Sequence, residues 1–325
     1  MHSRQFCLFC VLLMSLNIFA QGDGITTQYM NSQLMINPAY AGVRNAFSVH
    51  LLARQQWVGM EGAPATYSIS MHTPLNDRMA SLGASLLHYQ SGPINHSEFS
   101  AMYSYMLRIN HQLFLSLGLS AQCNYYHLGL SSLELIEEND PSFMHKFGNG
   151  VKPNFGVGVF LFSPHFYLGL SMPKVMNSRL KLKENDALVL ESVHTAYLTS
   201  GYAFSINKSA YLKPSFVVRY RSQASPLGDM NIQFMYKNIF WLGTSYRTND
   251  TMAALANIQL GEALSVCYSY DFAIGNSPRF GSGTHEVALV FDSHKLIKRN
   301  RDRQFRRKKV AKKEENKALH SIRYF

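Results

Sequence analysis

The residue types that most often perform catalysis are present in this chain, but their spacing matches no catalytic arrangement. The sequence has 13 His, yet no G-x-S-x-G turn marks a serine nucleophile, and the nearest stretch, Ser81–Ser85, alternates as a strand does. Beyond residue 20 there is no H-E-x-x-H or C-x-x-C motif, and His165, His194 and His285 are isolated. We therefore predict that the chain is not an enzyme and has no catalytic, cofactor-binding or metal site.

The cysteines give no redox or disulfide chemistry either. Cys7 and Cys10 lie in an N-terminal segment that we expect to be removed. Cys123 belongs to the apolar side of an alternating segment, and Cys267 belongs to the polar side of another. Because their side chains should point to opposite sides of the same wall, we predict that they form no disulfide.

The N-terminus is typical of a secretory signal peptide. Arg4 supplies a positive start, residues 6–19 are mostly apolar, and Ala20 is a small residue at the expected cleavage point. We expect residues 1–20 to be a signal peptide that is cleaved near Ala20. The mature chain would then begin in the cell envelope.

The basic character of the chain belongs to its C-terminal tail. Of the 31 Lys and Arg residues, 13 lie in residues 294–325 beside only 3 of the 20 acidic residues, a net charge of +10. With Arg4 also set aside, residues 21–293 have 17 basic and 17 acidic side chains. The high charge is therefore no sign of a folded domain that binds nucleic acid.

Two interpretations of this basic tail remain open. Charge runs of this kind usually form solvated extensions. The alternative is a periplasmic docking arm for an acidic partner, because such charge steers association. The candidate docking residues are the central basic run and the terminal aromatic pair, namely Arg306, Arg307, Lys308, Lys309, Tyr324 and Phe325.

Polarity alternates with a period of two along most of the mature chain, which predicts β-strands. In residues 113–127 the odd positions are mainly apolar and the even positions are mainly small and polar. No stretch beyond the signal peptide has the ~18 consecutive apolar residues of a transmembrane helix. The pattern predicts 14 strands, at residues 46–54, 66–73, 80–88, 96–108, 112–127, 154–162, 165–172, 193–204, 211–220, 229–237, 240–247, 252–260, 263–271 and 284–292.

The lengths of the connections predict an outer-membrane barrel rather than a soluble sandwich. Such barrels have short periplasmic turns, longer external loops and both termini in the periplasm. The short connections here follow even-numbered strands, at Asn110, Ser163-Pro164, Asn238 and Gly261-Glu262, whereas the long ones follow odd-numbered strands, at residues 55–65, 128–153, 173–192 and 272–283. We therefore predict an all-β, antiparallel barrel of about 14 strands in the outer membrane.

The same alternation predicts which charged side chains face the lumen. A Lys or Arg facing lipid at mid-depth costs roughly 2–4 kcal/mol, so the inward orientation is favoured. Whether these side chains bind a ligand or only brace the lumen stays open. The predicted inward set is His50, Arg54, Arg108, Lys213, Arg219, Asp229, Lys237, Asp271 and Glu286. Trp57, Tyr89, Trp241 and Tyr246 would form interfacial aromatic girdles.

The segment before the first strand is a candidate for a structural seal or for a partner site. Asn37, Pro38, Tyr40 and Gly42 belong to a run of turn-forming residues that would lie at the periplasmic mouth or fold into the lumen. Its role would be either to seal the barrel end or to contact a partner. Arg54 and Trp57 lie at the outer end of the first strand and are further candidates for partner contact.

Motifs along the whole mature chain resemble the PorP/SprF family of type IX secretion membrane proteins of Bacteroidota. They include Gln33-Leu-Met-Ile-Asn-Pro-Ala-Tyr-Ala-Gly42, Arg54-Gln-Gln-Trp-Val-Gly59, Phe240-Trp-Leu-Gly243 and Gly281-Ser-Gly283 with His285-Glu286. The terminal Arg323-Tyr-Phe325 also resembles that family, although the tail is longer and more basic than its minimal pattern.

The resemblance implies a component of the secretion and gliding machinery. Its expected partners are a secreted cargo protein such as an adhesin, periplasmic secretion-system proteins and outer-membrane lipid, with no nucleic acid and no cofactor. The alternatives are a transport pore for small solutes and a purely structural anchor. The expected organisation is a signal peptide at 1–20, an N-terminal periplasmic or plug segment at 21–45, a barrel at 46–293 and a basic periplasmic tail at 294–325.

Overall fold

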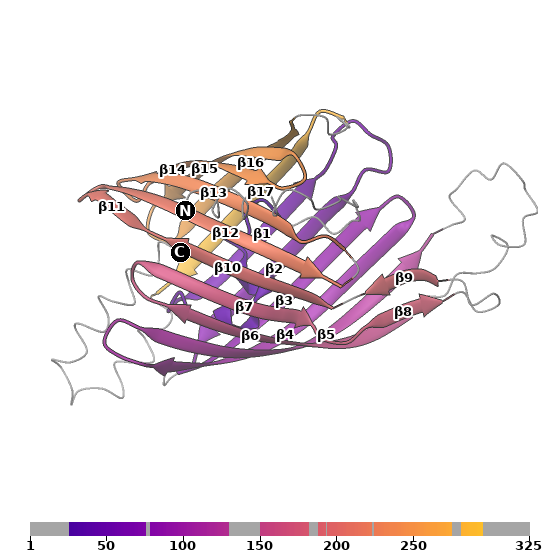
Figure 1. Ribbon diagram of the computed structural model, residues 1–325, viewed down its shortest axis with the longest axis horizontal. Coiled ribbons are helices and arrows are strands. Elements are labelled where there is room, and N and C mark those ends of the chain that lie inside the picture. The colour runs from indigo at the N-terminus through magenta and orange to yellow at the C-terminus, as the bar shows by residue number, and fades with distance from the viewer. Residues whose placement is uncertain are drawn as a thin grey trace, which may run out of the picture.

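The computed structural model describes residues 26–75, 79–129, 150–181, 188–192, 194–222, 224–274 and 281–294 (Figure 1). The predicted signal peptide and the basic tail beyond His294 lie outside these residues. The described strands form one large antiparallel sheet that curls into a barrel, with a separate small hairpin beyond one end (Figure 1).

The wall consists of strands that pair with their neighbours in chain order. They are β1 (Phe47–Gln55), β2 (Ala65–Pro74), β3 (Ala80–Ser91), β4 (Ile94–Arg108), β5 (Phe114–Leu128), β6 (Gly150–Phe162), β7 (Phe166–Lys174), β10 (Thr195–Tyr202) with its continuation β11 (Phe204–Asn207), β12 (Ala210–Arg221), β13 (Leu227–Tyr236), β14 (Phe240–Arg247), β15 (Thr251–Leu260), β16 (Leu264–Ala273) and β17 (Thr284–Ser293). Both β10 and β11 pair with β12, and β1 pairs with β17, from Phe47 opposite Ser293 to Gln55 opposite His285. The described chain therefore contains the predicted closed barrel of 14 strands.

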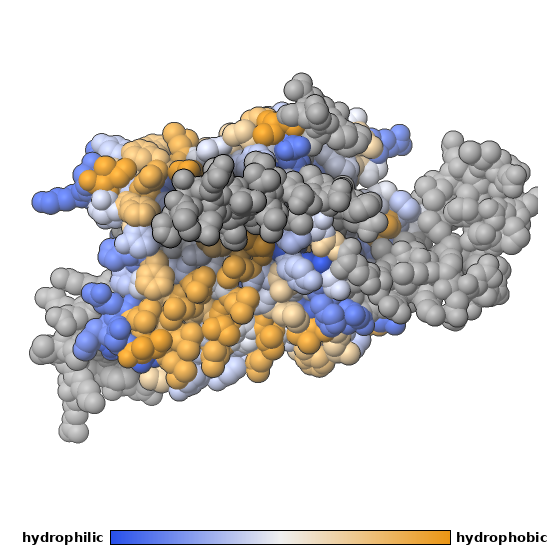
Figure 2. Space-filling model, viewed as in Figure 1, coloured by the Kyte–Doolittle hydropathy of each residue, from blue (hydrophilic) through white to orange (hydrophobic). Residues whose placement is uncertain are grey.

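Alternation decides which side chains face the lumen. On β4, Ser100 and Ser104 are at most 1% exposed, whereas Phe99 and Tyr103 on the other face are 53% and 44% exposed. Apolar side chains also gather on the outer surface over β6, β7 and β10 (Figure 2). A wall that is apolar outside and polar inside is the inverse of a soluble protein and suits a lipid surround.

The connections sort to the two ends of the barrel much as predicted. At one end, called here the short-turn end, the connections are 75–79, 109–113, 163–165, 208–209, 237–239 and 261–263. At the other, the long-loop end, they are 56–64, 92–93, 129–149, 175–194, 222–226, 248–250 and 274–283. The connection at Gly92-Pro93 is the shortest at the long-loop end, because Ser91 pairs directly with Ile94 in a tight hairpin.

Three details differ from the sequence prediction. The predicted loop at 173–192 contains a hairpin of β8 (Ser178–Lys181) and β9 (Leu188–Ser192), which pair only with each other in the described chain. Arg108 and Lys237 are exposed at the short-turn end instead of facing the lumen, because each lies where a strand gives way to a turn. Trp241 shares the face of the buried Ser245 and Arg247, and Tyr89 pairs across the sheet with the buried Thr66 and His96, so both rings point inward and not to a lipid girdle.

Helical structure in the described chain precedes β1. A single α-helical turn, α2 (Gln33–Ile36), is followed by a 3-10 turn, η1 (Pro38–Tyr40). No helix of the described residues has the length and apolar character needed to cross a membrane.

Candidate functional site in the barrel lumen

Residues 26–46, called here the lumen strap, lie inside the barrel. Most of their side chains are buried, and they contact inward-facing residues of strands from both halves of the wall. Between Ile36 and Arg44 the strap passes along the inner wall from β7 to β6, β4, β2 and finally β17. The polar contacts that mark this path are Ser171 Oγ to Ile36 O (2.6 Å), Asn37 Nδ2 to Val159 O (3.1 Å), Ser104 Oγ to Ala41 O (2.7 Å), Gly42 N to His72 Nδ1 (3.2 Å) and Arg44 Nη1 to Asp292 Oδ2 (2.7 Å).

Asn37 caps the 3-10 turn and also ties it to the wall. Its Oδ1 accepts a hydrogen bond from the backbone N–H of Ala39 at 2.9 Å, and its Nδ2 donates to Val159 on β6. The close approach is possible because the wall has glycine there. A Cβ at Gly118 would overlap the backbone at Ala39, and a Cβ at Gly158 would overlap the Asn37 side chain.

Tyr40 lies at the centre of an apolar cluster between the strap and the wall. Its ring makes edge contacts with His72 at 5.8 Å and Phe160 at 5.5 Å between centroids, and it is 2% exposed. The rest of the cluster comprises Leu34, Ala39, Ala41 and Val43 of the strap with Met102, Met106, Phe114, Phe162, Tyr167 and Ala203 of the wall. Burying an apolar side chain of this size contributes roughly 1.5–3 kcal/mol, so the strap is held firmly in the lumen.

The strap reaches the short-turn end at Arg44. The Arg44 guanidinium donates to Asp292 at 2.7 Å and, through Nε, to the Tyr40 hydroxyl at 3.1 Å. Ser48 Oγ also donates to Asp292, at 2.6 Å. Beside it, His294 Nδ1 lies 3.2 Å from the carbonyl oxygen of Asn45, so the last described residue is adjacent to the start of β1.

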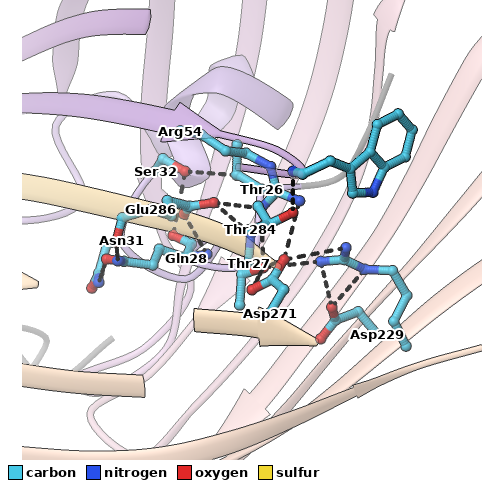
Figure 3. Close-up of polar contacts among 12 residues, drawn as sticks. Thr26, Thr27, Gln28, Asn31, Ser32, Arg54, Asp229, Asp271, Thr284 and Glu286 are labelled. Carbon is cyan, nitrogen blue, oxygen red and sulfur yellow. Dashed lines mark hydrogen bonds and ion pairs between the residues drawn. The ribbon is translucent and has the colours of Figure 1, made fainter. Parts of the chain in front are cut away.

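A cluster of buried charges surrounds the other end of the strap (Figure 3). Arg54 binds Glu286 at 2.8 Å and Asp271 at 3.1 Å, and all three side chains are at most 3% exposed. The backbone N–H groups of Thr27 and Gln28 donate to the two oxygens of Glu286 at 3.1 Å and 2.9 Å. The hydroxyl of Thr27 contacts the Asp271 carboxylate at 2.6 Å and 2.7 Å.

Two further residues extend this cluster across the lumen. Arg247 binds Asp229 at 3.1 Å through both Nε and Nη2, and Nη2 also contacts the Thr27 hydroxyl at 3.2 Å. The Ser245 hydroxyl donates to the same Asp229 carboxylate. The outer charge cluster, defined as Arg54, Asp229, Arg247, Asp271 and Glu286, thus has two cations and three carboxylates. Buried charges of this kind are tolerated only when they are paired and hydrogen-bonded, as they are here.

Tyr29 and Met30 fill the lumen next to this cluster. Both are fully buried and pack against Val217 on β12 and against Ala253 and Leu255 on β15. The Tyr29 hydroxyl lies 3.2 Å from Ser215 Oγ. The strap therefore combines polar anchors near both ends with apolar packing between them.

Trp57 lies outside the lumen in the connection after β1. It has a positive φ of 45° and its backbone N–H donates to Thr284 Oγ1 at 3.4 Å. The next residue, Val58, exchanges backbone hydrogen bonds with Gly283 at 3.0 Å and Ser282 at 2.8 Å. These contacts hold the connection after β1 against the connection before β17, at the long-loop end.

A cavity of about 270 Å³ remains between the strap and the opposite wall. It lies toward the short-turn end and is lined by residues of β14 to β17, by the short-turn connections 237–239 and 261–263, and by Asn31 and Arg44 of the strap. Asn257 lines it and is 7% exposed, and neither atom of its amide has a hydrogen-bond partner within the described chain. Trp241, which was expected outside, is part of this lining.

The structure places the candidate residues in three groups. Asn37, Pro38, Tyr40 and Gly42 are buried in the strap, Arg54 is in the outer charge cluster, and Trp57 is in an external connection. Arg306, Arg307, Lys308, Lys309, Tyr324 and Phe325 lie outside the described residues. Of the predicted inward charges, seven face the lumen, namely His50, Arg54, Lys213, Arg219, Asp229, Asp271 and Glu286.

Sequence reasoning missed Thr27, Gln28 and Arg247 as parts of the charge cluster. Arg247 could have been found, because it continues the period-two series of Gly243 and Ser245 on the inner face. Nothing in the local pattern marks Thr27, whose partners lie 27–259 residues away. Within the described ranges, no three His, Cys, Asp or Glu residues are grouped as metal ligands. Cys123 is exposed and Cys267 is buried, and the two form no disulfide.

Comparisons with known proteins agree on the class of the molecule. The family profile described as Type IX secretion system membrane protein PorP/SprF matches residues 18–291. A comparison with curated protein sequences gives no match. Among solved structures, a ΔS2S3 mutant of the monoaromatic hydrocarbon channel TodX is similar, with a TM-score of 0.51, 10% identity, and coverage of 81% of this chain and 94% of that chain.

A second similar structure is the outer-membrane protein Omp33 of Acinetobacter baumannii. It has a TM-score of 0.44 and 8% identity, and the match covers 76% of this chain and 99% of that chain. At such low identity, the likeness to the TodX mutant concerns the barrel fold alone.

Proposed function

Since this chain belongs to the PorP/SprF family of type IX secretion system membrane proteins, we propose that it is a non-enzymatic outer-membrane component that anchors a secreted cargo protein and contacts periplasmic secretion proteins. The observation that carries the proposal is the family match over residues 18–291, which spans the strap and nearly the whole barrel. Localisation in the outer membrane follows from the fold and the family.

The filled lumen supports anchoring over the alternative of solute transport. A diffusion pore needs an open path, whereas here the strap and its apolar cluster occupy the lumen beside β2 to β7. The burial of Asn37, Pro38, Tyr40 and Gly42 also supports a sealing role for that motif over direct partner contact. Cargo would then meet the long-loop end, where Trp57 is half-exposed.

The basic tail is the proposed contact with periplasmic proteins. It follows β17, whose last residue Ser293 lies at the short-turn end, which is the periplasmic end of such barrels. A net charge of +10 in residues 294–325 would attract an acidic surface.

The test is a deletion strain complemented with chosen variants. We expect loss of the gene to remove a defined secreted protein from the cell surface, and the wild-type gene to restore it. Trp57→Ala should reduce that display, and Tyr89→Ala, a half-exposed aromatic on β3 also near the long-loop end, serves as the matched control. An unchanged surface proteome, together with stable conductance of the purified barrel in planar bilayers, would contradict the anchoring function and support solute transport.

A further inference from the structure

The lumen strap has its two ends at opposite mouths of the barrel. Asn45 precedes β1 and lies beside His294, so the C-terminal end of the strap is at the short-turn end. Thr27, in contrast, contacts Arg54, which is the penultimate residue of β1, and Arg247, which is the last residue of β14. Both of these residues lie at the long-loop end.

The remaining partners of Thr27 give the same location independently. Asp271 pairs across the sheet with Thr284, the first residue of β17, and Glu286 follows two residues later. The charge cluster around Thr27 thus includes residues of β1, β13, β14, β16 and β17, and each of them is near the end of a strand that meets a long-loop connection.

The strap residues between Thr27 and Arg44 run continuously through the lumen from the long-loop end to the short-turn end. Thr27 contacts Asp271 on β16, and Asn31 Nδ2 lies 3.5 Å from the sulfur of Cys267 on the same strand. Asp271 and Cys267 are four residues apart on β16, which corresponds to roughly 13 Å along the wall. The strap then crosses to the opposite wall and finally reaches Asp292, one residue before the end of β17.

We propose that the mature chain has its two ends on opposite sides of the outer membrane, with the amino terminus at the external mouth and the basic tail in the periplasm. The long-loop end of outer-membrane barrels is external, and Thr27, next to the first described residue, lies at that mouth. This replaces the expectation that both termini are periplasmic. The inner end of the strap carries the sealing contacts, and the amino terminus that precedes its buried outer end is the part that molecules outside the cell would reach.

The proposal predicts a specific pattern of thiol labelling. In a background with Cys123→Ala and Cys267→Ala, a cysteine is introduced by Asp23→Cys before the strap, or by Lys309→Cys in the tail. Two exposed control sites show how a cysteine at each end of the barrel is labelled. They are Glu61→Cys at the long-loop end and Lys208→Cys at the short-turn end. Each variant is first checked for the heat-modifiable mobility of a folded barrel, and cells are then treated with a bulky, membrane-impermeant maleimide.

The expected result is that Asp23→Cys behaves as Glu61→Cys does and is labelled on intact cells. Lys309→Cys should behave as Lys208→Cys does and be labelled only after the outer membrane is permeabilised. If Asp23→Cys is labelled only after permeabilisation, or in neither condition, the proposed topology is wrong. The result is independent of the secretion role, because labelling reports the position of the terminus and not the identity of any partner.

Discussion

Two wall glycines show how single residues fix the strap. Gly118 on β5 and Gly158 on β6 face the Asn37-Pro38-Ala39 turn, and any side chain there would enter space that the turn occupies. Because the atoms opposite Gly118 belong to the backbone of Pro38 and Ala39, they cannot move aside as the end of a flexible side chain can.

We predict that Gly118→Ala destabilises the barrel by about 1–3 kcal/mol, the usual cost of overpacking a filled interior. The measurement is the temperature at which the purified protein loses its heat-modifiable mobility. Gly83→Ala on β3 is the matched control, since its Cβ would make ordinary contacts at 3.4 Å and 3.5 Å. Equal transition temperatures for the two variants would contradict the packing argument.

Arg54 is the residue on which the outer charge cluster depends most. The cluster has a net charge of −1 from two arginines and three carboxylates. Removing Arg54 would leave the cluster at −2, whereas neutralising Glu286 would bring it to zero.

We therefore predict that Arg54→Met costs about 3–5 kcal/mol, as expected when one partner of a buried ion pair is removed. Glu286→Gln should cost less, because it relieves the excess negative charge while keeping a similar shape. Equilibrium unfolding in urea would measure both. A larger loss for Glu286→Gln than for Arg54→Met would show that the backbone hydrogen bonds to Glu286 matter more than the charge balance.

At the scale of elements, the strap and the strands form for different reasons. The strands are fixed by alternation, as on β4, where serine faces the lumen and Phe99 and Tyr103 face outward. The strap has only the short turns α2 and η1, and its position comes from contacts with strands of both halves of the wall, such as β2, β4, β6 and β7 on one side and β16 and β17 on the other.

The basic tail is the element whose role can be separated from the barrel. We predict that deletion of residues 299–325 leaves a folded, heat-modifiable barrel but abolishes contact with periplasmic secretion proteins and surface display of the cargo. A variant with Arg306, Arg307, Lys308 and Lys309 changed to Gln keeps the length and tests charge alone. Unchanged surface display of the cargo in the deletion strain would mean that the tail is not a docking arm.

At the scale of the whole molecule, the barrel and its strap form a closed unit. The strap fills one side of the lumen with an apolar cluster, and a cavity of about 270 Å³ remains on the other side toward the short-turn end. The outer charge cluster and the pair of Tyr29 and Met30 lie between that cavity and the long-loop end.

We predict that the full-length protein shows no stable conductance in planar bilayers and that deletion of residues 26–44 produces an open pore. The deletion removes the apolar contacts that fill the lumen while leaving every wall strand in place. Heat-modifiable mobility is the control that the shortened chain still folds. Steady conductance of the full-length protein would show that the strap does not seal the lumen.

The wall of this protein follows from the local pattern of its residues. The alternation of polarity assigns each strand residue to the lumen or to the outer face. It therefore predicts the strands, most of the charged residues in the lumen, and the opposite orientations of Cys123 and Cys267. The prediction that Arg108 and Lys237 face the lumen is wrong, because strands become turns at these residues and alternation no longer applies. The match of the sequence to its family likewise needed no coordinates.

The path of the strap and the composition of the charge cluster depend on contacts between distant parts of the chain. Thr27 meets Asp271 and Glu286 because the barrel closes between β1 and β17, which brings together residues more than 200 positions apart. Residues 26–46 lack the alternation of polarity that marks a strand, so their sequence does not predict that they lie in the lumen. The place of the strap depends on the space left by Gly118 and Gly158, which exists only once the wall has folded.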